Sequence, residues 1–317
     1  MKFAIVGSGF GLYGYLPALI GLGHSVVLPQ RYQERFFARP ELKRFGDHVE
    51  WQADEEAALS RAAGVVIAQR PENQREWVLR SLAFPNIDRL VLEKPLAPTP
   101  EEAIELDLSL AQSRKAYRVG YTFCGLSWTS RIREFAGDHP TGDLSIDWRF
   151  LAHHFHHGLS NWKRWNSAGG GAIRFYGIQL IAALAQSGYR VVSESHAVGP
   201  SAAETTGWSA VFSGDGLPNC RILVDCQSEA TRFEIVSRTS RGLDATLFQE
   251  MNPFASEPWR PASAQLDGRI GAVGDVVRSL FEREDAALAW YPEVLKLWQS
   301  VEDQTAFSDN GRPRRNR

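Results

Sequence analysis

The sequence predicts two domains: an α/β domain built on a doubly wound parallel sheet, then an α+β domain with a large, mostly antiparallel open sheet. Three observations predict this. Short apolar runs alternate with helical patterns over the first 120 residues. After Gly120 the strands alternate apolar and polar residues instead. The chain, at 317 residues, also exceeds the roughly 250 to 300 at which a single core stops growing.

The first domain is expected to alternate strands and helices. The predicted strands are 2–7, 24–28, 49–51, 64–68, 89–92 and 117–120. The predicted helices are 14–22, 33–38, 54–61, 71–82 and 99–113. Thr99 supplies an N-cap, and Pro100 followed by two glutamates suits a first helical turn. Right-handed crossovers then place helices on both faces of a parallel sheet.

The second domain begins with different patterning. Leu144 to Phe150 alternates apolar and polar residues, as a strand with one wet face does. Further strands are expected at 208–212, 221–226 and 232–237, and helices at 172–186 and 291–301. The predicted division is 1–120 for the first domain, 121–307 for the second, and 308–317 for a disordered, arginine-rich tail.

Composition excludes several classes of partner. The 35 basic and 37 acidic side chains leave a net charge of −2, which lacks the electrostatic footprint of a nucleic-acid or anionic-membrane binder. The three cysteines have no CxxC spacing, so a reducing, cytoplasmic setting is expected. The apolar run from Lys2 to Leu22 is an alternative signal peptide, but its glycines and Pro17 oppose a helical segment. No other stretch is expected to span a membrane.

A glycine cluster, Gly7 to Gly14, lies where the first strand meets the first helix. Such a turn lets the backbone approach a pyrophosphate, whose charge meets free N–H groups at the helix start. The residues expected to bind a dinucleotide here are Gly7, Ser8, Gly9, Phe10, Gly11 and Leu12. Two frames of the GxGxxG fingerprint remain open, one starting at Gly7 with leucine third and one starting at Gly9. A glycine-rich turn without a ligand is the alternative.

The end of the second strand bears on which dinucleotide binds. An NAD site usually has an acid there for the ribose 2′-hydroxyl, whereas an NADP site provides arginine for the 2′-phosphate. Here the strand ends in Gln30 and Arg31 without an acid, so NADP is preferred over NAD. The alternative is that Arg31 is a solvated side chain. Gln69, after the strand 64–68, is also expected at the cofactor.

Glu93 and Lys94 directly follow the strand 89–92. The carboxyl ends of parallel strands face the ligand crevice, so both residues are expected at the cofactor, with Lys94 near the nicotinamide. A lysine that is poor in solvent and near a positive ring loses its proton more readily and can serve as an acid or base.

These residues together resemble the Gfo/Idh/MocA oxidoreductases. The matching segments are Gly7–Gly11 with Leu16-Pro17-Ala18-Leu19, Glu93-Lys94-Pro95-Leu96-Ala97, Val119-Gly120-Tyr121, Trp162-Lys163, and Gly169-Gly170-Gly171-Ala172 with Gly177. The resemblance implies a Rossmann domain and a substrate domain whose open sheet often mediates oligomers, here a homodimer or homotetramer. It also implies NAD(P)-dependent chemistry on sugars, cyclitols or their derivatives.

The sequence departs from the family where the chemistry is expected. The family's usual Asp and His fall on Phe175 and Gln179. Phenylalanine exchanges no protons, and glutamine only forms hydrogen bonds. Lys94 is then the sole acid or base of the family type, aided by Tyr121, Tyr176 or Arg174.

Four of the eight histidines lie together in His153-His154-Phe155-His156-His157. If the strand from Leu144 continued, His153 and His157 would share one face, and His154 and His156 the other. A metal site lacks enough further ligands, so none is expected. The alternatives are contacts to the substrate, in place of the missing family histidine, and packing at the sheet edge.

The sequence therefore predicts an oxidoreductase that moves a hydride between a nicotinamide cofactor and a sugar, cyclitol or nucleotide-sugar-like substrate. Catalysis is expected from Lys94, Tyr121 and Gln179. Substrate binding is expected from His153, His154, His156, Lys163, Arg174, Tyr176 and Gln179. The alternative is a catalytically impaired member that binds NAD(P) as a structural or sensing ligand and acts through protein partners. A third possibility is NAD-assisted glycoside cleavage.

Overall fold

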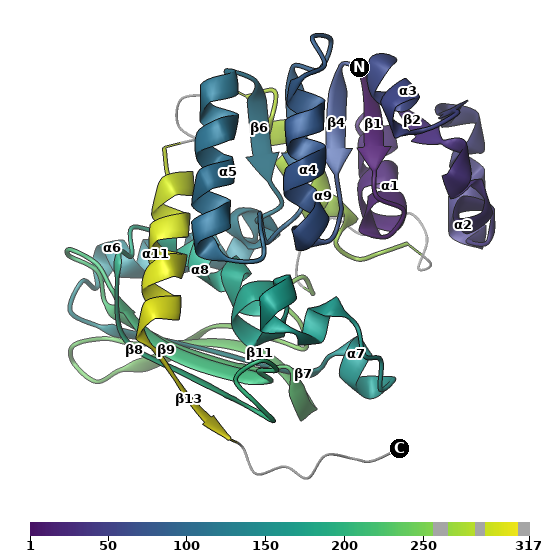
Figure 1. The fold of residues 1–317 in the computed structure, drawn as a ribbon. Coiled ribbons are helices and arrows are strands. Elements are labelled where there is room, and N and C mark those ends of the chain that lie inside the picture. Colours follow the sequence, from purple (N-terminus) through teal and green to yellow (C-terminus); the bar gives the residue numbers. More distant parts are fainter. Residues whose placement is uncertain (256–265, 283–288, 310–317) are drawn as a thin grey trace. The chain divides into compact units, whose positions relative to one another are not determined.

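A computed structural model describes residues 1–255, 266–282 and 289–309. The chain forms two compact units. Of the described residues, the first unit holds 1–97, 104–125 and 266–282. The second holds residues 98–103, 126–255 and 289–309. Each unit is built on one sheet (Figure 1).

The sheet of the first unit is six-stranded and parallel throughout. Its strands are β1 (Lys2–Val6), β2 (Ser25–Pro29), β3 (Val49–Gln52), β4 (Gly64–Ile67), β5 (Arg89–Leu92) and β6 (Ala116–Val119). Their order is β3-β2-β1-β4-β5-β6, with Phe3 level with Val26 on one side and Gly64 on the other. The chain reverses direction of winding between β1 and β4, which is where ligands bind in such sheets. The predicted doubly wound fold is confirmed.

The helices of this unit begin where the sequence supplies a start. They are η1 (Gly11–Tyr15), α1 (Leu16–Gly21), η2 (Gln30–Tyr32), α2 (Gln33–Phe37), η3 (Pro40–His48), α3 (Glu55–Ser60), α4 (Pro71–Leu82), η4 (Thr122–Gly125) and α5 (Pro100–Ser113), whose first four residues are grouped with the second unit. The hydroxyl of Thr99 accepts the N–H of Glu102 at 3.3 Å, as expected of an N-cap. The predicted helix 14–22 is instead a π-helical turn followed by a short α-helix.

Helix α9 (Ile270–Ser279) belongs to the first unit, although it comes late in the chain. Its buried residues Ile270, Val273 and Val277 pack into the same apolar cluster as strands β1 and β2. Arg118 on β6 anchors its end, donating to the carbonyl of Ser279 at 2.6 Å. The predicted division at residue 120 is therefore corrected, because the second unit loses this segment and the first extends to residue 125.

The sheet of the second unit is seven-stranded and mostly antiparallel. Its strands are β7 (Asp143–Leu151), β8 (Val191–Gly199), β9 (Gly207–Ser213), β10 (Asn219–Asp225), β11 (Gln227–Arg238), β12 (Asp244–Glu250) and β13 (Thr305–Asp309). The order is β12-β11-β7-β10-β9-β8-β13, and among the described strands of this sheet only the pairs β7–β10 and β8–β13 are parallel. The predicted open sheet is confirmed, but β8, β12 and β13 were not predicted.

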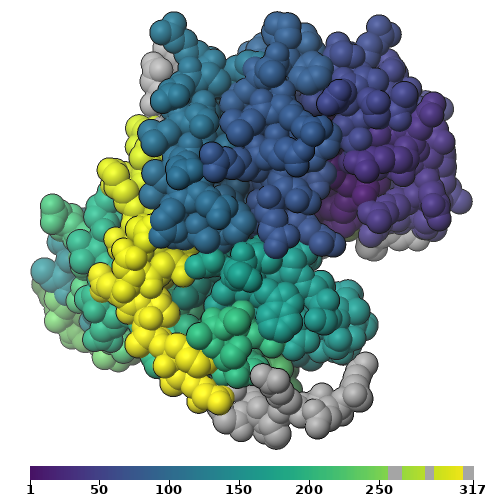
Figure 2. All heavy atoms as spheres, viewed as in Figure 1, coloured from purple at the N-terminus to yellow at the C-terminus, as the bar shows by residue number. Residues whose placement is uncertain are grey.

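Helices cover one face of this sheet. They include α6 (Ser127–Asp138), η7 (Ala172–Gly177), α8 (Ile178–Gln186) and α11 (Tyr291–Gln304), with α7 (His153–His156), η5 (Trp162–Arg164) and η6 (Asn166–Ala168) in the connections. The large buried side chains of Trp128, Trp208 and Trp298 fill the core beneath them. Figure 2 shows α11 and β13, in yellow, on the surface of this unit.

Two expectations about the chain's segments change here. Asn166–Gln186 is long and apolar enough to cross a membrane by composition, but 83% of that apolar window is buried, as in the core helix of a soluble protein. Of the predicted tail, residues 308 and 309 are the end of β13, and residues 310–317 lie outside the described residues.

Replacing Arg118 with alanine should lower the free energy of unfolding by about 3 kcal/mol, because it strips a buried side chain of its packing and leaves the carbonyls of Tyr117 and Ser279 without their donors. Urea denaturation followed by circular dichroism measures this. The matched control is Arg75→Ala, which removes a surface pair with Glu105 and should change stability by less than about 0.5 kcal/mol. An equal loss in both variants would contradict the anchoring role.

Candidate cofactor and substrate sites

The glycine turn joins β1 to η1 with different demands on each glycine. Gly7 has a φ of +131°, and a Cβ there would lie 2.2 Å from the carbonyl oxygen of Ala68. A Cβ on Gly11 would lie 2.7 Å from Cγ2 of Ile5, so Gly11 sets the close contact of helix and strand. A Cβ on Gly9 would meet nothing within 4 Å. The frame that starts at Gly7 therefore fits best, with the third glycine's role on Gly11 instead of Leu12.

The backbone at Gly9 is open on the side where a Cβ would lie. The turn leaves the backbone bare at the head of a helix, where N–H groups favour a phosphate. Ser8 and Phe10 flank it and are half-buried, whereas Leu12 is fully buried in the core. Leu12 thus contributes packing and a backbone N–H bonded to Gly9 at 3.0 Å. Arg269, in the segment before α9, places its guanidinium over the ring of Phe10, 4.3 Å from the ring centroid.

The N–H of Gly7 is already occupied. It donates to the hydroxyl of Tyr32 at 2.9 Å, and that hydroxyl donates to Oε1 of Glu55 at 2.9 Å. Burial, followed by the charge of Glu55, raises the pKa of Tyr32 far above its ordinary value. Tyr32 therefore stays protonated and joins the turn to a carboxylate.

Glu55 changes the interpretation of the neighbouring arginine. Arg31 forms an ion pair with Glu55, whose side chain is 7% exposed, and its Nε donates to Oε1 at 2.6 Å. The second strand ends without an acid, as the sequence shows, but the structure supplies one from the residue that opens α3, after the third strand. Arg35 also reaches the turn, donating to the hydroxyl of Ser8 at 2.5 Å. Gln30 is exposed beside this group.

The loop that carries Lys94 is held from several sides. The hydroxyl of Tyr15 donates to Glu93 at 2.8 Å, and Nε2 of Gln74 donates to the carbonyls of Glu93 and Leu96 at 2.6 and 3.0 Å. The peptide bond from Lys94 to Pro95 is cis. Lys94 itself is half-buried. The hydrogen bonds from Tyr15 and Gln74 hold this loop, and with it Lys94, at the carboxyl end of β5.

Two further predicted residues lie at neighbouring strand ends. Tyr121 is buried two residues beyond β6, and Gln69 is half-buried two residues beyond β4. Gly120, before the tyrosine, has no room for a side chain, since a Cβ would lie 2.7 Å from the hydroxyl of Tyr15. The ends of β4, β5 and β6 thus bring Gln69, Lys94 and Tyr121 to one edge of the sheet.

In the second unit, the histidine cluster is helical and not the strand expected from its pattern. Strand β7 ends at Leu151, and α7 begins at His153. His153 and His157 are therefore one turn apart, with tilted rings whose centroids are separated by 4.4 Å. The rings of His153, His156 and His157 are on the exposed side, and only His154 is buried. Among the described residues, no three His, Cys, Asp or Glu side chains are grouped so that they could hold a metal ion.

His154 is the one member of the cluster in a position to act as a neutral base or hydrogen-bond partner. Its side chain is 2% exposed, and its Nε2 has no hydrogen-bond partner within the described chain. Burial, with the charges of Lys163 and Arg164, lowers its pKa to about 4. An imidazole that stays neutral at physiological pH can accept or donate one hydrogen bond.

Aromatic rings surround the positions where the family has Asp and His. The ring of Phe175 meets Trp162 edge-on at 5.2 Å and Tyr176 at 4.8 Å. Nζ of Lys163 lies 5.1 Å from the centroid of Phe175. Gln179 is buried on α8, 6% exposed. Phe175, Trp162, Tyr176 and Lys163 thus form an amphipathic group of aromatic rings and one amine.

Arg174 has a structural role. Its Nε donates to Glu302 at 2.8 Å, and its Nη1 donates to the carbonyls of Pro98 and Asn166 at 3.0 and 2.8 Å. These bonds tie η7 to α11 and to the start of α5. Its contact with a substrate stays a prediction, and the bonds found here already use Nε, Nη1 and Nη2 of its guanidinium.

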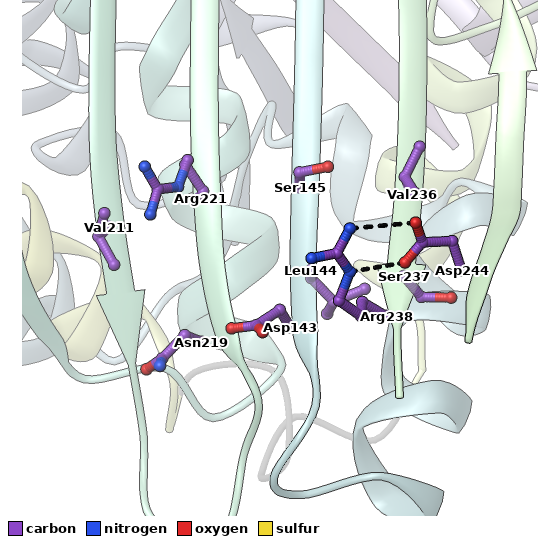
Figure 3. Close-up of a pocket in the computed structure, with 10 residues that line it drawn as sticks. All are labelled: Asp143, Leu144, Ser145, Val211, Asn219, Arg221, Val236, Ser237, Arg238 and Asp244. Atoms are coloured by element: carbon purple, nitrogen blue, oxygen red, sulfur yellow. Dashed lines mark hydrogen bonds and ion pairs between the residues drawn. The ribbon is translucent and has the colours of Figure 1, made fainter. Parts of the chain in front are cut away.

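A cavity of about 320 Å³ lies on the open face of the seven-stranded sheet (Figure 3). It is lined by Asp143, Leu144, Ser145, Val211, Asn219, Arg221, Val236, Ser237, Arg238 and Asp244. Two of its charges, Arg238 and Asp244, pair with each other. None of the lining residues belongs to the groups described above, so this cavity adds no acid or base to the candidate sites.

No protein-family model matches the sequence, and no curated protein matches it. Solved structures do match its fold over nearly the whole chain. The 3-ketoreductase KijD10 from Actinomadura kijaniata, in complex with NADP and TDP-benzene, is 15% identical with a TM-score of 0.67, covering 98% of this chain and 99% of that one. The resemblance to the Gfo/Idh/MocA oxidoreductases is confirmed at the level of the fold.

Two more of these structures show the range of proteins with this fold. The WlbA (WbpB) dehydrogenase from Thermus thermophilus, in complex with NAD and UDP-GlcNAcA, is 15% identical, with 98% of this chain and 97% of that chain covered and a TM-score of 0.65. A super-repressor mutant of Gal80p from Saccharomyces cerevisiae is 12% identical, with coverages of 96% and 94% and a TM-score of 0.69. Because one fold serves a dehydrogenase and a repressor, function has to be argued from the site.

Gly7→Ala and Gly9→Ala should separate folding from binding. A Cβ on Gly7 meets a backbone carbonyl at positive φ and should lower the free energy of unfolding by more than about 2 kcal/mol. A Cβ on Gly9 meets only open space, so stability should stay within about 1 kcal/mol. Binding of NADPH should nevertheless weaken about tenfold or more in Gly9→Ala, measured by nicotinamide fluorescence. Unaltered binding in that variant would contradict the assignment of the turn.

The buried His154 should make stability depend on pH. Its pKa is about 4 when folded and about 6.5 when unfolded, so the unfolded chain binds more protons between these values. Its contribution to stability is complete above pH 6.5 and is lost as the pH falls toward 4, with a slope of up to about 1.4 kcal/mol per pH unit. His154→Gln should flatten this part of the profile in urea denaturation, whereas His156→Gln, at an exposed position, should not. Identical profiles for both variants would refute the buried neutral state.

Proposed function

We propose that this chain is an NAD(P)-dependent oxidoreductase that moves a hydride to or from a sugar, cyclitol or nucleotide-sugar-like substrate. The observation that carries the proposal is the glycine turn, where Gly7 and Gly11 are required by packing and Gly9 is left bare at a helix start. A bound nicotinamide would supply the hydride donor or acceptor. The fold is shared with KijD10 and WlbA, whose structures hold such cofactors together with nucleotide or nucleotide-sugar ligands.

Lys94 is the residue we assign to proton transfer. It lies on a rigid loop at the carboxyl end of β5, the edge at which such sheets hold their ligands. As the hydride leaves or reaches the substrate carbon, Nζ of Lys94 would take a proton from the hydroxyl or give one to the carbonyl oxygen. Tyr121 and Gln179 are proposed as helpers that position this oxygen through hydrogen bonds.

Substrate contacts are assigned to the amphipathic group of the second unit. Tyr176 and Phe175 offer ring faces, and Lys163 offers a charge for an anionic substituent. His154 Nε2 is proposed as a neutral hydrogen-bonding atom in place of the histidine that the family usually has. His153 and His156 are exposed and would contact only parts of a ligand that extend into solvent.

For the cofactor we propose NADP in preference to NAD. Two guanidinium groups, those of Arg31 and Arg35, lie at the end of β2 and beside Ser8 of the turn. A 2′-phosphate is the part of NADP that such groups recognise. For the assembly we propose a homodimer or homotetramer through the open face of the seven-stranded sheet, and for the setting the cytoplasm.

Lys94→Met should abolish turnover while leaving cofactor affinity within about threefold of the wild type, because it removes the proton-transferring amine but keeps a side chain of similar length. A panel of sugars and nucleotide sugars, followed at the nicotinamide absorbance, measures turnover, and fluorescence titration measures affinity. Lys115 directly precedes β6, at the amino end of that strand, and donates to the carbonyl of Phe84, so Lys115→Met is a control that should keep full turnover.

Unchanged turnover in Lys94→Met would refute the role of Lys94. Tight cofactor binding by the wild type without turnover across the panel would favour the alternative, a protein that binds NAD(P) as a structural or sensing ligand. The replacement of the family's Asp and His by Phe175 and Gln179 is what motivates that alternative. Product release without net cofactor reduction would instead indicate NAD-assisted glycoside cleavage.

A further inference from the structure

We propose that Glu55 limits the discrimination of this chain between NADP and NAD, because its buried carboxylate neutralises the arginine that faces the 2′ position of the adenosine ribose. The inference rests on the proposed cofactor function. It concerns a residue that no strand-end pattern in the sequence identifies, since Glu55 follows β3 and the arginine follows β2.

The two charges, those of Arg31 and Glu55, differ in their exposure to solvent. The side chain of Arg31 is 60% exposed, whereas that of Glu55 is 7% exposed. Both Nε and Nη2 of Arg31 donate to the same oxygen of Glu55, Oε1. The bonds to Glu55 use Nε and Nη2 but not Nη1, and more than half of the side chain is exposed to solvent. Arg31 thus offers one end to the cofactor while the other end is bound to an anion.

The carboxylate is held in place from a second side. The hydroxyl of Tyr32 donates to the same Oε1, and that tyrosine in turn accepts the N–H of Gly7. Tyr32 is buried and is bonded to Gly7 of the turn. The carboxylate of Glu55 therefore cannot move away from Arg31 without breaking its hydrogen bond with Tyr32. The negative charge is therefore a fixed part of the site.

The consequence for each cofactor follows from the charges. At the end of β2, Arg31 and Arg35 contribute two positive charges, and Glu55 removes one of them. A phosphate monoester carries nearly two negative charges at neutral pH, so the 2′-phosphate of NADP is attracted by the arginines and repelled by Glu55. The 2′-hydroxyl of NAD is neutral and is nearly insensitive to that carboxylate. Glu55 therefore weakens the binding of NADP more than that of NAD, and the wild type is expected to bind both.

The test is Glu55→Gln. Glutamine keeps an oxygen that can accept from Arg31 and Tyr32 and occupies nearly the same volume, so the substitution removes the charge alone. The Kd for NADPH should fall about three- to tenfold at low salt, which is the scale of one partly screened unit charge. The Kd for NADH should change by less than about twofold. At about 0.5 M salt the gain for NADPH should shrink, because exposed charges are screened. Equilibrium fluorescence titration gives the Kd for NADPH and for NADH, in the wild type and in Glu55→Gln, without any need for turnover.

Two further variants serve as controls. Glu56→Gln changes the next residue, whose side chain is 65% exposed and reaches Arg80, and should leave both constants unchanged. Arg31→Ala should weaken NADPH binding in the wild-type and in the Glu55→Gln background. Thermal unfolding shows whether Glu55→Gln folds. If it does not, Glu55→Ser, which removes the same charge, is used in its place.

Three results would overturn the inference. NADPH affinity that is unchanged in folded Glu55→Gln, while Arg31→Ala weakens it, would show that the carboxylate does not limit discrimination. A weaker affinity for NADPH would show that Glu55 supports the arginine instead of opposing it. Binding of neither cofactor by the wild type would overturn the proposed function together with this inference, whereas the first two results leave the proposed function intact.

Discussion

The close approach of Gly7 to the carbonyl oxygen of Ala68 is the constraint on which the rest of the first unit depends. The chain turns there directly out of β1 while β4 lies beside it, and no side chain fits into that contact. This turn sets the start of η1, the bare backbone at Gly9 and the packing of Gly11 on Ile5. It also presents the N–H of Gly7 to Tyr32, which links the turn to Glu55.

The loop that carries Lys94 is held by hydrogen bonds to its backbone carbonyls and to the side chain of Glu93. Gln74 reaches two carbonyls on either side of Pro95, and Tyr15 holds the carboxylate of Glu93. A loop without regular structure would otherwise leave these buried groups unpaired at considerable cost in free energy. The rigidity that results is what gives Lys94 a fixed place, and a fixed proton-transferring group is what hydride chemistry requires of the protein.

Sequence patterning predicted the features that depend on neighbours along the chain. The six parallel strands, the start of α4 at Pro71 and the lysine after β5 all follow from local periodicity, proline position and strand order. The third glycine was assigned less well, because the role depends on the distance from Gly11 to Ile5 and not on the spacing in a motif. Local signals were therefore sufficient for the sheet and only partly sufficient for its turn.

What the sequence could not provide are contacts made across the fold. Arg31 and Glu55 are brought together by the pairing of β2 with β3, and α9 joins the first unit through an apolar face that looks like that of any amphipathic helix. No glycine or proline separates β7 from the histidines that follow it, so the sequence did not indicate that a helix begins at His153. In the second unit, β12 and β13 are largely exposed, which weakens the alternation of apolar and polar residues that identifies a strand.

Hydrogen–deuterium exchange of the wild-type chain with and without saturating NADPH tests the central claim most directly, since it maps where the cofactor binds. Backbone amides should exchange more slowly in peptides that contain Gly9 to Leu12, the residues after β2, and the loop around Lys94. The amide of Gly7 should change little, because it is already bonded to Tyr32. Binding of NADPH without protection at Gly9 to Leu12 would contradict the account.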